Sequence, residues 1–145
     1  MSDCVLAIDQ GTTGSTALLL DKNVRVIAAH NVEFPNHYPK PGWVEHDVEE
    51  IWASIEAAVR GALEKAGPVR IVAIGITNQR ETSLFWDRDS GEPIHRALVW
   101  QDRRTTDFCA ALKASVKDGS NSLEPHLTLV LQGSFALPLP SPLTR

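Results

Sequence analysis

The chain has 145 residues, of which 43% are hydrophobic and 22% charged, and its formal net charge is −4. This length fits one domain, and the mild acidity argues against a nucleic-acid binder, which would normally carry a basic face. The two cysteines have no metal-binding or redox spacing and are typical of free thiols in a reducing compartment. Because the N-terminus does not resemble a secretory leader and no apolar run reaches membrane length, we expect a soluble, cytoplasmic protein.

The first third of the chain predicts three short strands. Residues 5–8 and 17–20 are apolar runs of strand length, and residues 23–34 supply a third run that partly alternates. Short turns join these runs, so we expect an antiparallel meander. Residues 35–43 contain three prolines and a glycine and are expected to form a loop.

Residues 45–67 give the clearest helix signal. Asp47 and Glu50 have the spacing of a capping box, and the Gly67-Pro68 pair is typical of a helix end. The residues expected to form its buried face, from their helical spacing, are Val48, Ile51, Trp52, Ile55, Val59, Ala62 and Leu63.

The next segments predict a sheet that continues beyond this helix. Residues 69–79 are almost continuously apolar, which predicts a strand buried on both faces. Residues 82–102 are expected to form a hairpin that turns at residues 88–92, and residues 103–115 to contain the start of a second helix. Meander, helix and buried strand together predict an α/β layer arrangement.

The composition changes near residue 115. Between residues 125 and 144 there is no Asp, Glu, Lys or Arg, and four of the nine prolines lie there. We therefore predict a patterned domain over residues 1–114 and a divergent, low-charge, proline-containing tail over residues 115–145.

The turn after the first strand is a candidate phosphate-binding loop. Small residues let the backbone approach a polyanion, so that its N–H groups can bind the anion. The residues in this turn that fit the requirement are Gly11, Thr12, Thr13 and Gly14. Asp9, at the strand end, could hold a Mg²⁺ that bridges phosphates. The alternative is a polar hairpin whose glycines merely permit positive φ, and the turn taken alone favours this alternative. Neither a P-loop nor a dinucleotide fingerprint is present.

Two further strand ends carry candidate substrate residues. Arg80 and Glu81 follow the apolar strand, and an arginine beside an acid suits a ligand with several hydroxyl groups. Trp100 ends a later strand, where an indole face could pack on the carbon skeleton of a polyol. The alternatives are a surface ion pair for the first two and a core tryptophan for the third.

Other chemistry-bearing residues give weaker signals. Trp43, Trp52 and Trp86 are interpreted as core tryptophans, and Asp102 with the following arginines as caps of the next helix. The five histidines have no ligand spacing and none pairs with a nucleophile, so we interpret them as structural. The sequence shows no hydrolase triad or metal cage.

Four segments in one order resemble the FGGY carbohydrate kinase family over roughly residues 4–114. They are DQGTTGS at 9–15, PKPGWVEHD at 39–47, GITNQRET at 75–82 and VWQDRRT at 99–105. NQRET together with WQDRR is similar to the branch of the family that phosphorylates glycerol. The resemblance implies a ribonuclease-H-like fold of the actin and hexokinase type, with ATP, Mg²⁺ and glycerol as ligands and transfer to sn-glycerol 3-phosphate.

The resemblance also implies roles for the candidate residues. The turn Gly11–Gly14 would meet the nucleotide phosphates, Asp9 would help to hold Mg²⁺, and Arg80, Glu81 and Trp100 would line the glycerol site. This chain departs from the family at Gly14 and Thr16, where members commonly have serine and arginine. Family members often assemble into oligomers.

The tail is the larger departure from the family. Residues 115–145 lack the family's T-G-L-x-x-D-P-Y-F-S segment, and the second domain, which carries the catalytic-base aspartate, is not in this sequence. We therefore assign no catalytic residue and expect a truncated kinase without activity on its own. The alternatives are a short non-catalytic form that binds glycerol or a partner kinase subunit, and a nucleotide-binding module of the actin or chaperone type.

Overall fold

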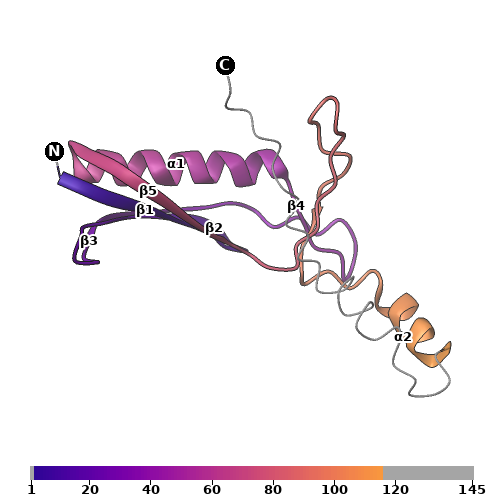
Figure 1. The fold of residues 1–145 in the computed structure, drawn as a ribbon. Coiled ribbons are helices and arrows are strands. Elements are labelled where there is room, and N and C mark those ends of the chain that lie inside the picture. The colour runs from indigo at the N-terminus through magenta and orange to yellow at the C-terminus, as the bar shows by residue number, and fades with distance from the viewer. Residues whose placement is uncertain (1, 116–145) are drawn as a thin grey trace.

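The computed structural model describes residues 2–115, which form a four-stranded sheet with a long helix on one face (Figure 1). The strand order is β3-β2-β1-β5, and a two-stranded ribbon of β4 and β6 lies beyond one end of the sheet. The elements are β1 (Ser2–Gln10), β2 (Gly14–Leu20), β3 (Val26–Glu33), β4 (Glu45–His46), α1 (Val48–Ala66), β5 (Val69–Asn78), β6 (Ala97–Leu98) and α2 (Thr106–Ser115). No helix in this part of the chain has both the length and the apolar character needed to cross a membrane.

The first three strands form the antiparallel meander that the sequence predicts. β1 pairs with β2, and β2 with β3, both antiparallel. β5 then joins the other edge of β1 in parallel, after a crossover that contains α1. Antiparallel strands can be joined by tight turns, whereas a parallel pair needs such a crossover, so the order of elements along the chain explains this topology.

Helix α1 begins and ends close to the predicted residues. The Asp47 carboxylate accepts a hydrogen bond from the N–H of Glu49 at 3.0 Å, and Gly67, at φ 71°, donates to the carbonyl of Leu63. The predicted capping box is wrong in its second half. The carboxylate of Glu50 does not reach back to the cap; its Oε2 lies 2.7 Å from His37 Nε2.

The buried face of α1 is narrower than the predicted one. The side chains fully buried against the sheet are small, namely Ser54, Ala58 and Ala62. Trp52, which we expected in the core, is 59% exposed. The physical reason is the close approach of helix and sheet, which leaves no room for a large side chain along the line of contact. A Cβ atom at Gly61, for example, would overlap the His30 ring.

The core lies between α1 and the meander. Leu19 on β2 is completely buried there, and the thiol of Cys4 on β1 is nearly so. The Ser15 and Ser54 hydroxyls, 2.8 Å apart, satisfy each other in this interface. The buried core residues are Cys4, Leu6, Ala17, Leu19, Ala28, Ala58 and Ala62.

The prediction that residues 69–79 are buried on both faces is wrong. β5 is an edge strand, and Ile74 and Ile76 on it are 61% and 73% exposed. Helix α1 packs mainly on β2 and β3; Val69, at the start of β5, packs against the core, and no strand within residues 2–115 pairs with the outer edge of β5. The prediction of an apolar strand is confirmed, but the prediction that other elements cover both of its faces is wrong.

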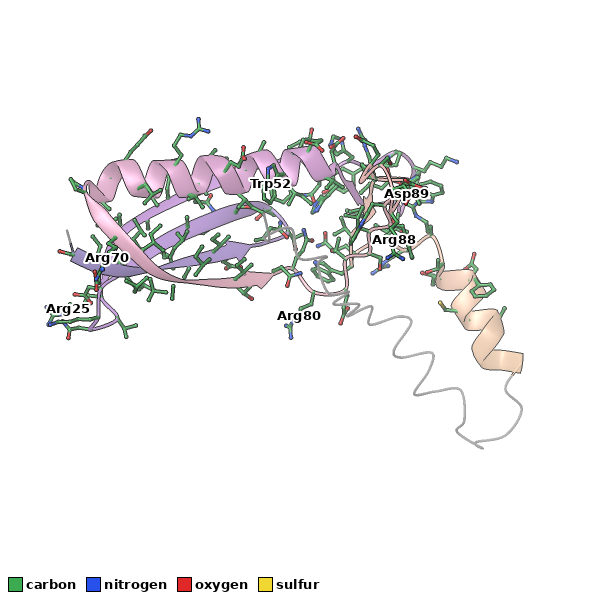
Figure 2. All side chains as sticks on the ribbon, turned by 45° about the horizontal axis from the view of Figure 1, so that its top comes forward. Arg25, Trp52, Arg70, Arg80, Arg88 and Asp89 are labelled. Atoms are coloured by element: carbon green, nitrogen blue, oxygen red, sulfur yellow. The ribbon has the colours of Figure 1, made fainter. Side chains whose placement is uncertain are left out.

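The predicted hairpin forms as an exposed loop with two short bridges. The bridges join Ser83 to Leu98 and Trp86 to Pro93, and the turn is closed by the N–H of Gly91 donating to Asp87. Trp86 is 42% exposed, so its interpretation as a core residue is wrong. Figure 2 shows Arg88 and Asp89 of this loop beyond the end of α1, away from the sheet.

Candidate functional site

A cavity of about 450 Å³ opens where β1 and β5 end. Because these two strands are parallel, their carboxyl ends meet at the same edge of the sheet, and the residues that follow them face each other. The lining residues are Asp9, Gly11, Thr12, Asn78, Gln79, Arg80, Glu81 and Trp100. Three motifs that are distant in sequence therefore share one cavity.

The structure brings together most of the predicted site residues, but not all of them. Asp9, Gly11 and Thr12 line the cavity with Arg80, Glu81 and Trp100, whereas Thr13 and Gly14 are not part of the lining. Gly14 has a packing explanation instead: a Cβ atom there would lie 2.8 Å from the carbonyl oxygen of Val32 on β3. The identity of this glycine therefore follows from strand packing.

The turn at residues 11–14 is tight and keeps backbone donors available. The N–H of Gly11 donates to the carbonyl of Gly14 at 2.9 Å, and the carbonyl of Thr13 accepts from Phe34. Within residues 2–115, the N–H groups of Thr12 and Thr13 donate to no other group. Two adjacent N–H groups without an internal acceptor, one of them on the cavity-lining Thr12, are a suitable arrangement for binding an anion.

Trp100 connects the turn to the other side of the cavity. Its indole Nε1–H donates to Thr12 Oγ1 at 3.0 Å, across 88 positions of sequence. Trp100 is 52% exposed, so it is not a core tryptophan. Its backbone is held by the adjacent Val99, whose N–H donates to the carbonyl of Val44. The indole face is thus presented to the cavity with its polar edge already paired.

Arg80 and Glu81 follow β5 in an unusual backbone conformation. Glu81 has φ 66°, in the left-handed region that a residue with a Cβ atom seldom adopts. Within the described residues neither side chain makes a salt bridge, so the alternative of a mutual ion pair is not what the structure shows. Figure 2 shows Arg80 beyond the end of β5, projecting away from the ribbon.

The motifs at residues 39–47 and 99–105 are joined by a buried charge cluster. Arg104 Nη2 lies 2.7 Å from Glu45 Oε1 and 2.8 Å from Asp102 Oδ2, and the same Asp102 oxygen accepts from the N–H of Val44. The Arg104 guanidinium also lies 3.8 Å above the ring of Trp43. Asp102 and Arg104 therefore serve to hold the loop that carries Trp100, rather than only to cap α2.

The charge cluster controls the ionisation of its members. Burial alone would raise the pKa of Asp102, but hydrogen bonds from Arg104 and from the N–H of Val44 outweigh burial, and the pKa is lowered overall. The pKa of Arg104 is raised by its hydrogen bond to Asp102, against desolvation and with help from Glu45. Both groups stay charged over the physiological pH range.

Sequence reasoning missed four residues at or behind the cavity. Asn78 and Gln79 are part of the lining, and Gln10 with His46 forms buried contacts directly behind Gln79. The signal that could have found the first two is their position, since the residues that directly follow a parallel strand face the ligand edge of the sheet. His46 could not have been found this way, because it comes from a separate short strand.

Asp9 is the one predicted metal residue, and it suits a shared metal rather than a protein cage. Its exposed carboxylate lies in the cavity beside the turn. No group of three or more His, Cys, Asp or Glu side chains able to hold a metal is found in the described residues. A single carboxylate fits Mg²⁺ that arrives with phosphates and keeps several waters.

Comparison with known proteins defines the class to which the fold and cavity belong. The N-terminal domain of the FGGY family of carbohydrate kinases matches residues 4–139. The chain belongs to this family, and its fold is that of the actin- and hexokinase-like ATPases, as the sequence predicted. The match continues past residue 114, where we expected the resemblance to end, and the boundary at that residue stays a prediction.

Within the family, the curated relatives are glycerol kinases. The chain is 53% identical over 130 residues to glycerol kinase of Brucella ovis, which covers 88% of this chain and 25% of the relative. It is 56% identical over 122 residues to glycerol kinase of Rhodospirillum centenum, and this alignment covers 83% of this chain and 24% of the relative. The chain therefore spans about a quarter of the length of these relatives.

Solved structures of FGGY kinases have the same fold as this chain. Plasmodium falciparum glycerol kinase with ADP has a TM-score of 0.72 and 33% identity, over 78% of this chain and 23% of that one. Gluconate kinase of Lactobacillus acidophilus has a TM-score of 0.74 at 20% identity, over 79% of this chain and 23% of that one, and supports the fold alone.

Proposed function

We propose that this chain forms one wall of the site in which a glycerol kinase transfers the γ-phosphoryl group of ATP to glycerol, giving sn-glycerol 3-phosphate. The observation that carries the proposal is the convergence of the 9–15, 75–82 and 99–105 segments on one cavity. The indole of Trp100 and the hydroxyl of Thr12 are hydrogen-bonded across it. The similarity to glycerol kinases supports the choice of glycerol as the substrate.

The proposed polyol contacts lie on the β5 side of the cavity. The Glu81 carboxylate accepts hydrogen bonds from glycerol hydroxyls, the Arg80 guanidinium donates to them, and the Trp100 indole packs on the carbon skeleton. A vicinal diol can place a separate hydroxyl on each of the two side chains, whereas a simple alcohol has only one hydroxyl to share between them.

The proposed phosphate contacts lie on the β1 side. The free N–H groups of Thr12 and Thr13 bind phosphate oxygens, while Gly11 and Gly14 close the turn that presents them. Asp9 holds Mg²⁺ jointly with the phosphates of ATP. The metal, when bound, supplies charge neutralisation at the phosphate oxygens.

Turnover requires more than these residues. Phosphoryl transfer needs donor, acceptor, metal and base aligned in a closed cleft. We assign no catalytic base among residues 2–115, and we expect the 145-residue chain alone to bind glycerol without phosphorylating it. Formation of glycerol 3-phosphate from ATP and glycerol by the pure chain would contradict this expectation.

The binding experiment is a glycerol titration followed by tryptophan fluorescence. The chain has four tryptophans, so the signal is assigned with two variants, Trp100→Phe at the cavity and Trp52→Phe on the outer side of α1. We expect a saturable change in the wild type and in Trp52→Phe, and none in Trp100→Phe or Glu81→Gln. A change that never saturates, or one that persists in Trp100→Phe, would reject the proposed polyol site.

A further inference from the structure

A chain of amide and imidazole groups, buried at His46 and Gln10 and half-buried at Asn36 and Gln79, runs from the loop before α1 to the turn at residue 11. His46, on β4, is completely buried, with its Nε2 atom 2.5 Å from Asn36 Oδ1 and its Nδ1 atom 3.1 Å from Gln79 Nε2. Gln79 Nε2 also lies 3.3 Å from Gln10 Oε1, and Gln10 Nε2 lies 2.7 Å from the carbonyl oxygen of Gly11. Together these contacts connect segments that are distant in sequence.

The backbone carbonyl of Gly11 fixes the direction of every hydrogen bond in this chain. A carbonyl oxygen only accepts, so Gln10 presents its amide N–H₂ to Gly11 and its oxygen to Gln79. Gln79 then presents its own N–H₂ group to both Gln10 and His46, while its oxygen accepts from the hydroxyl of Thr82 at 2.9 Å. His46 consequently accepts at Nδ1 and donates from Nε2 to Asn36.

Two members of this chain, Gln79 and Gly11, adjoin the two halves of the site. Gln79 directly precedes Arg80 and Glu81, and its backbone N–H donates to the carbonyl of Gln10 at 2.6 Å. Gly11 opens the phosphate-binding turn. A left-handed residue such as Glu81, with φ 66°, persists only where its surroundings hold it. The hydrogen bond from the Thr82 hydroxyl to Gln79 Oε1 spans Glu81 and connects this turn to Gln79.

We propose that the hydrogen-bonded chain Asn36–His46–Gln79–Gln10 is a positioning device that sets Arg80 and Glu81 relative to the phosphate-binding turn, and that it works only while His46 is neutral. His46 and Gln10 are positioning residues, since neither is part of the cavity lining, and Gln79 connects them to the lining. The inference rests on the proposed function for its consequence in glycerol binding, but its structural part can be tested without any ligand.

The requirement for a neutral imidazole follows from the donors around it. A protonated His46 would carry N–H groups on both nitrogens, and its Nδ1–H would face the N–H₂ group of Gln79, donor against donor. Burial lowers the pKa of His46, the nearby His37 lowers it further, and Glu50 opposes the change. Glu45, next to it on β4, is held by Arg104, and Phe34 packs edge-on against the ring at 5.0 Å.

The sign of the pH effect follows from the direction of this pKa shift. The folded state holds His46 neutral to lower pH than an unfolded chain does, so the arrangement is intact at neutral pH and fails as the pH falls through the lowered pKa. As His46 becomes protonated, we expect glycerol to bind about three- to tenfold more weakly, the loss typical of one net hydrogen bond.

The first experiment is an NMR titration of the full chain without ligand. We expect the imidazole nitrogens of His46 to report the Nε2–H tautomer at neutral pH. The amide resonances of Gly11, Arg80 and Glu81 should shift with the same midpoint as His46. If those amides do not follow the His46 titration, the positioning role is wrong, whatever glycerol does.

The second experiment uses Gln79→Glu, which replaces the amide donor facing Nδ1 by an acceptor. We expect the His46 midpoint to rise, because the protonated imidazole now donates to the carboxylate. We also expect the glycerol affinity of this variant to improve on acidification, whereas that of the wild type declines. A His46 midpoint that is unchanged or lower in Gln79→Glu would overturn the proposal.

The matched control is Ser54→Ala, which removes a different buried hydrogen bond at the interface of helix and sheet. This control should lower the free energy of unfolding without moving the His46 midpoint or the resonances of Arg80 and Glu81. If Ser54→Ala moved them as Gln79→Glu does, a general loss of stability would explain both. If the wild type does not bind glycerol but its Gly11, Arg80 and Glu81 amides titrate together with His46, the proposed polyol site is rejected and the positioning role of the chain is supported.

Discussion

The meander under α1 and the edge strand β5 have similar apolar sequences and very different surroundings. Leu19, in the meander, has no exposed surface, whereas Ile76, on β5, is 73% exposed. The two strands β1 and β5 are adjacent and parallel, so the difference arises within one sheet (Figure 1). Apolar composition shows that a strand requires cover; the position of the helix decides which strands of this chain receive it.

The sharpest test of this difference is to truncate one side chain in the meander and one on β5. We expect Leu19→Ala to lower the free energy of unfolding by about 3 kcal/mol, because it leaves a cavity in a closely packed interface. Ile76→Ala should change the free energy of unfolding by less than about 0.5 kcal/mol, as an exposed position does. Urea denaturation of the two variants and the wild type measures both values.

Equal losses for Leu19→Ala and Ile76→Ala would break the comparison. Such a result would mean that β5 is covered in solution, and the exposed row on its surface would then be part of a core. A small loss at both positions would instead mean that the packing of α1 on the meander contributes little.

The sequence predicted this fold well where the signal is local. The Asp47 and Gly67 ends of α1, the meander and the turn near Gly91 all follow from the residues that form them. Burial was predicted less well, because the approach of α1 to the sheet is set by small residues such as Ala58, and helical spacing alone favours large residues like Trp52.

The candidate site was partly predictable for a related reason. Asp9 lies near the end of a strand, Arg80 and Trp100 lie just after strands, and strand ends can be predicted along the chain. That these ends share one cavity depends on the parallel pairing of β1 with β5, which no local pattern contains. The role of His46 could not be predicted from local sequence patterns, because its contact with Gln79 joins segments that are distant in the sequence.

A substitution in the charge cluster of Glu45, Asp102 and Arg104 tests whether the loops at residues 39–47 and 99–105 have a stabilising core of their own. We expect Arg104→Leu to lower the free energy of unfolding by about 2 kcal/mol, because it leaves the buried Glu45 and Asp102 carboxylates without their cation. The neighbouring Arg103→Leu is the matched control, since Arg103 is exposed and makes no salt bridge within the described residues. Thermal and urea unfolding of both variants measure the difference.

A loss in Arg104→Leu that Arg103→Leu does not share would show that the loops at residues 39–47 and 99–105 fold as a unit. Similar, small changes in both variants would show that the cluster orders Trp100 without stabilising the chain. Fluorescence separates this outcome from complete insensitivity, because the Trp100 indole would still change its environment in Arg104→Leu. Since Arg104 also lies over the ring of Trp43, the comparison is made with Trp43→Phe in both proteins.

The smallest effect is expected where the two regions meet, at the ion pair between β1 and β5. Arg70 makes two hydrogen bonds of 2.6 Å to the carboxylate of Asp3, at the exposed end of the sheet where Figure 2 shows Arg70. The hydrogen bond from Arg70 lowers the pKa of Asp3, so any contribution is present above the ordinary Asp pKa and is lost as the pH falls through the lowered value. Both groups are exposed to solvent, and we expect Arg70→Gln to unfold at the same urea concentration as the wild type in physiological salt.

This result would mean that the backbone hydrogen bonds between β1 and β5 suffice to hold the edge strand. A clear loss in Arg70→Gln at neutral pH that disappears in acid would show instead that β5, without a covering layer, depends on this one pair to stay in the sheet.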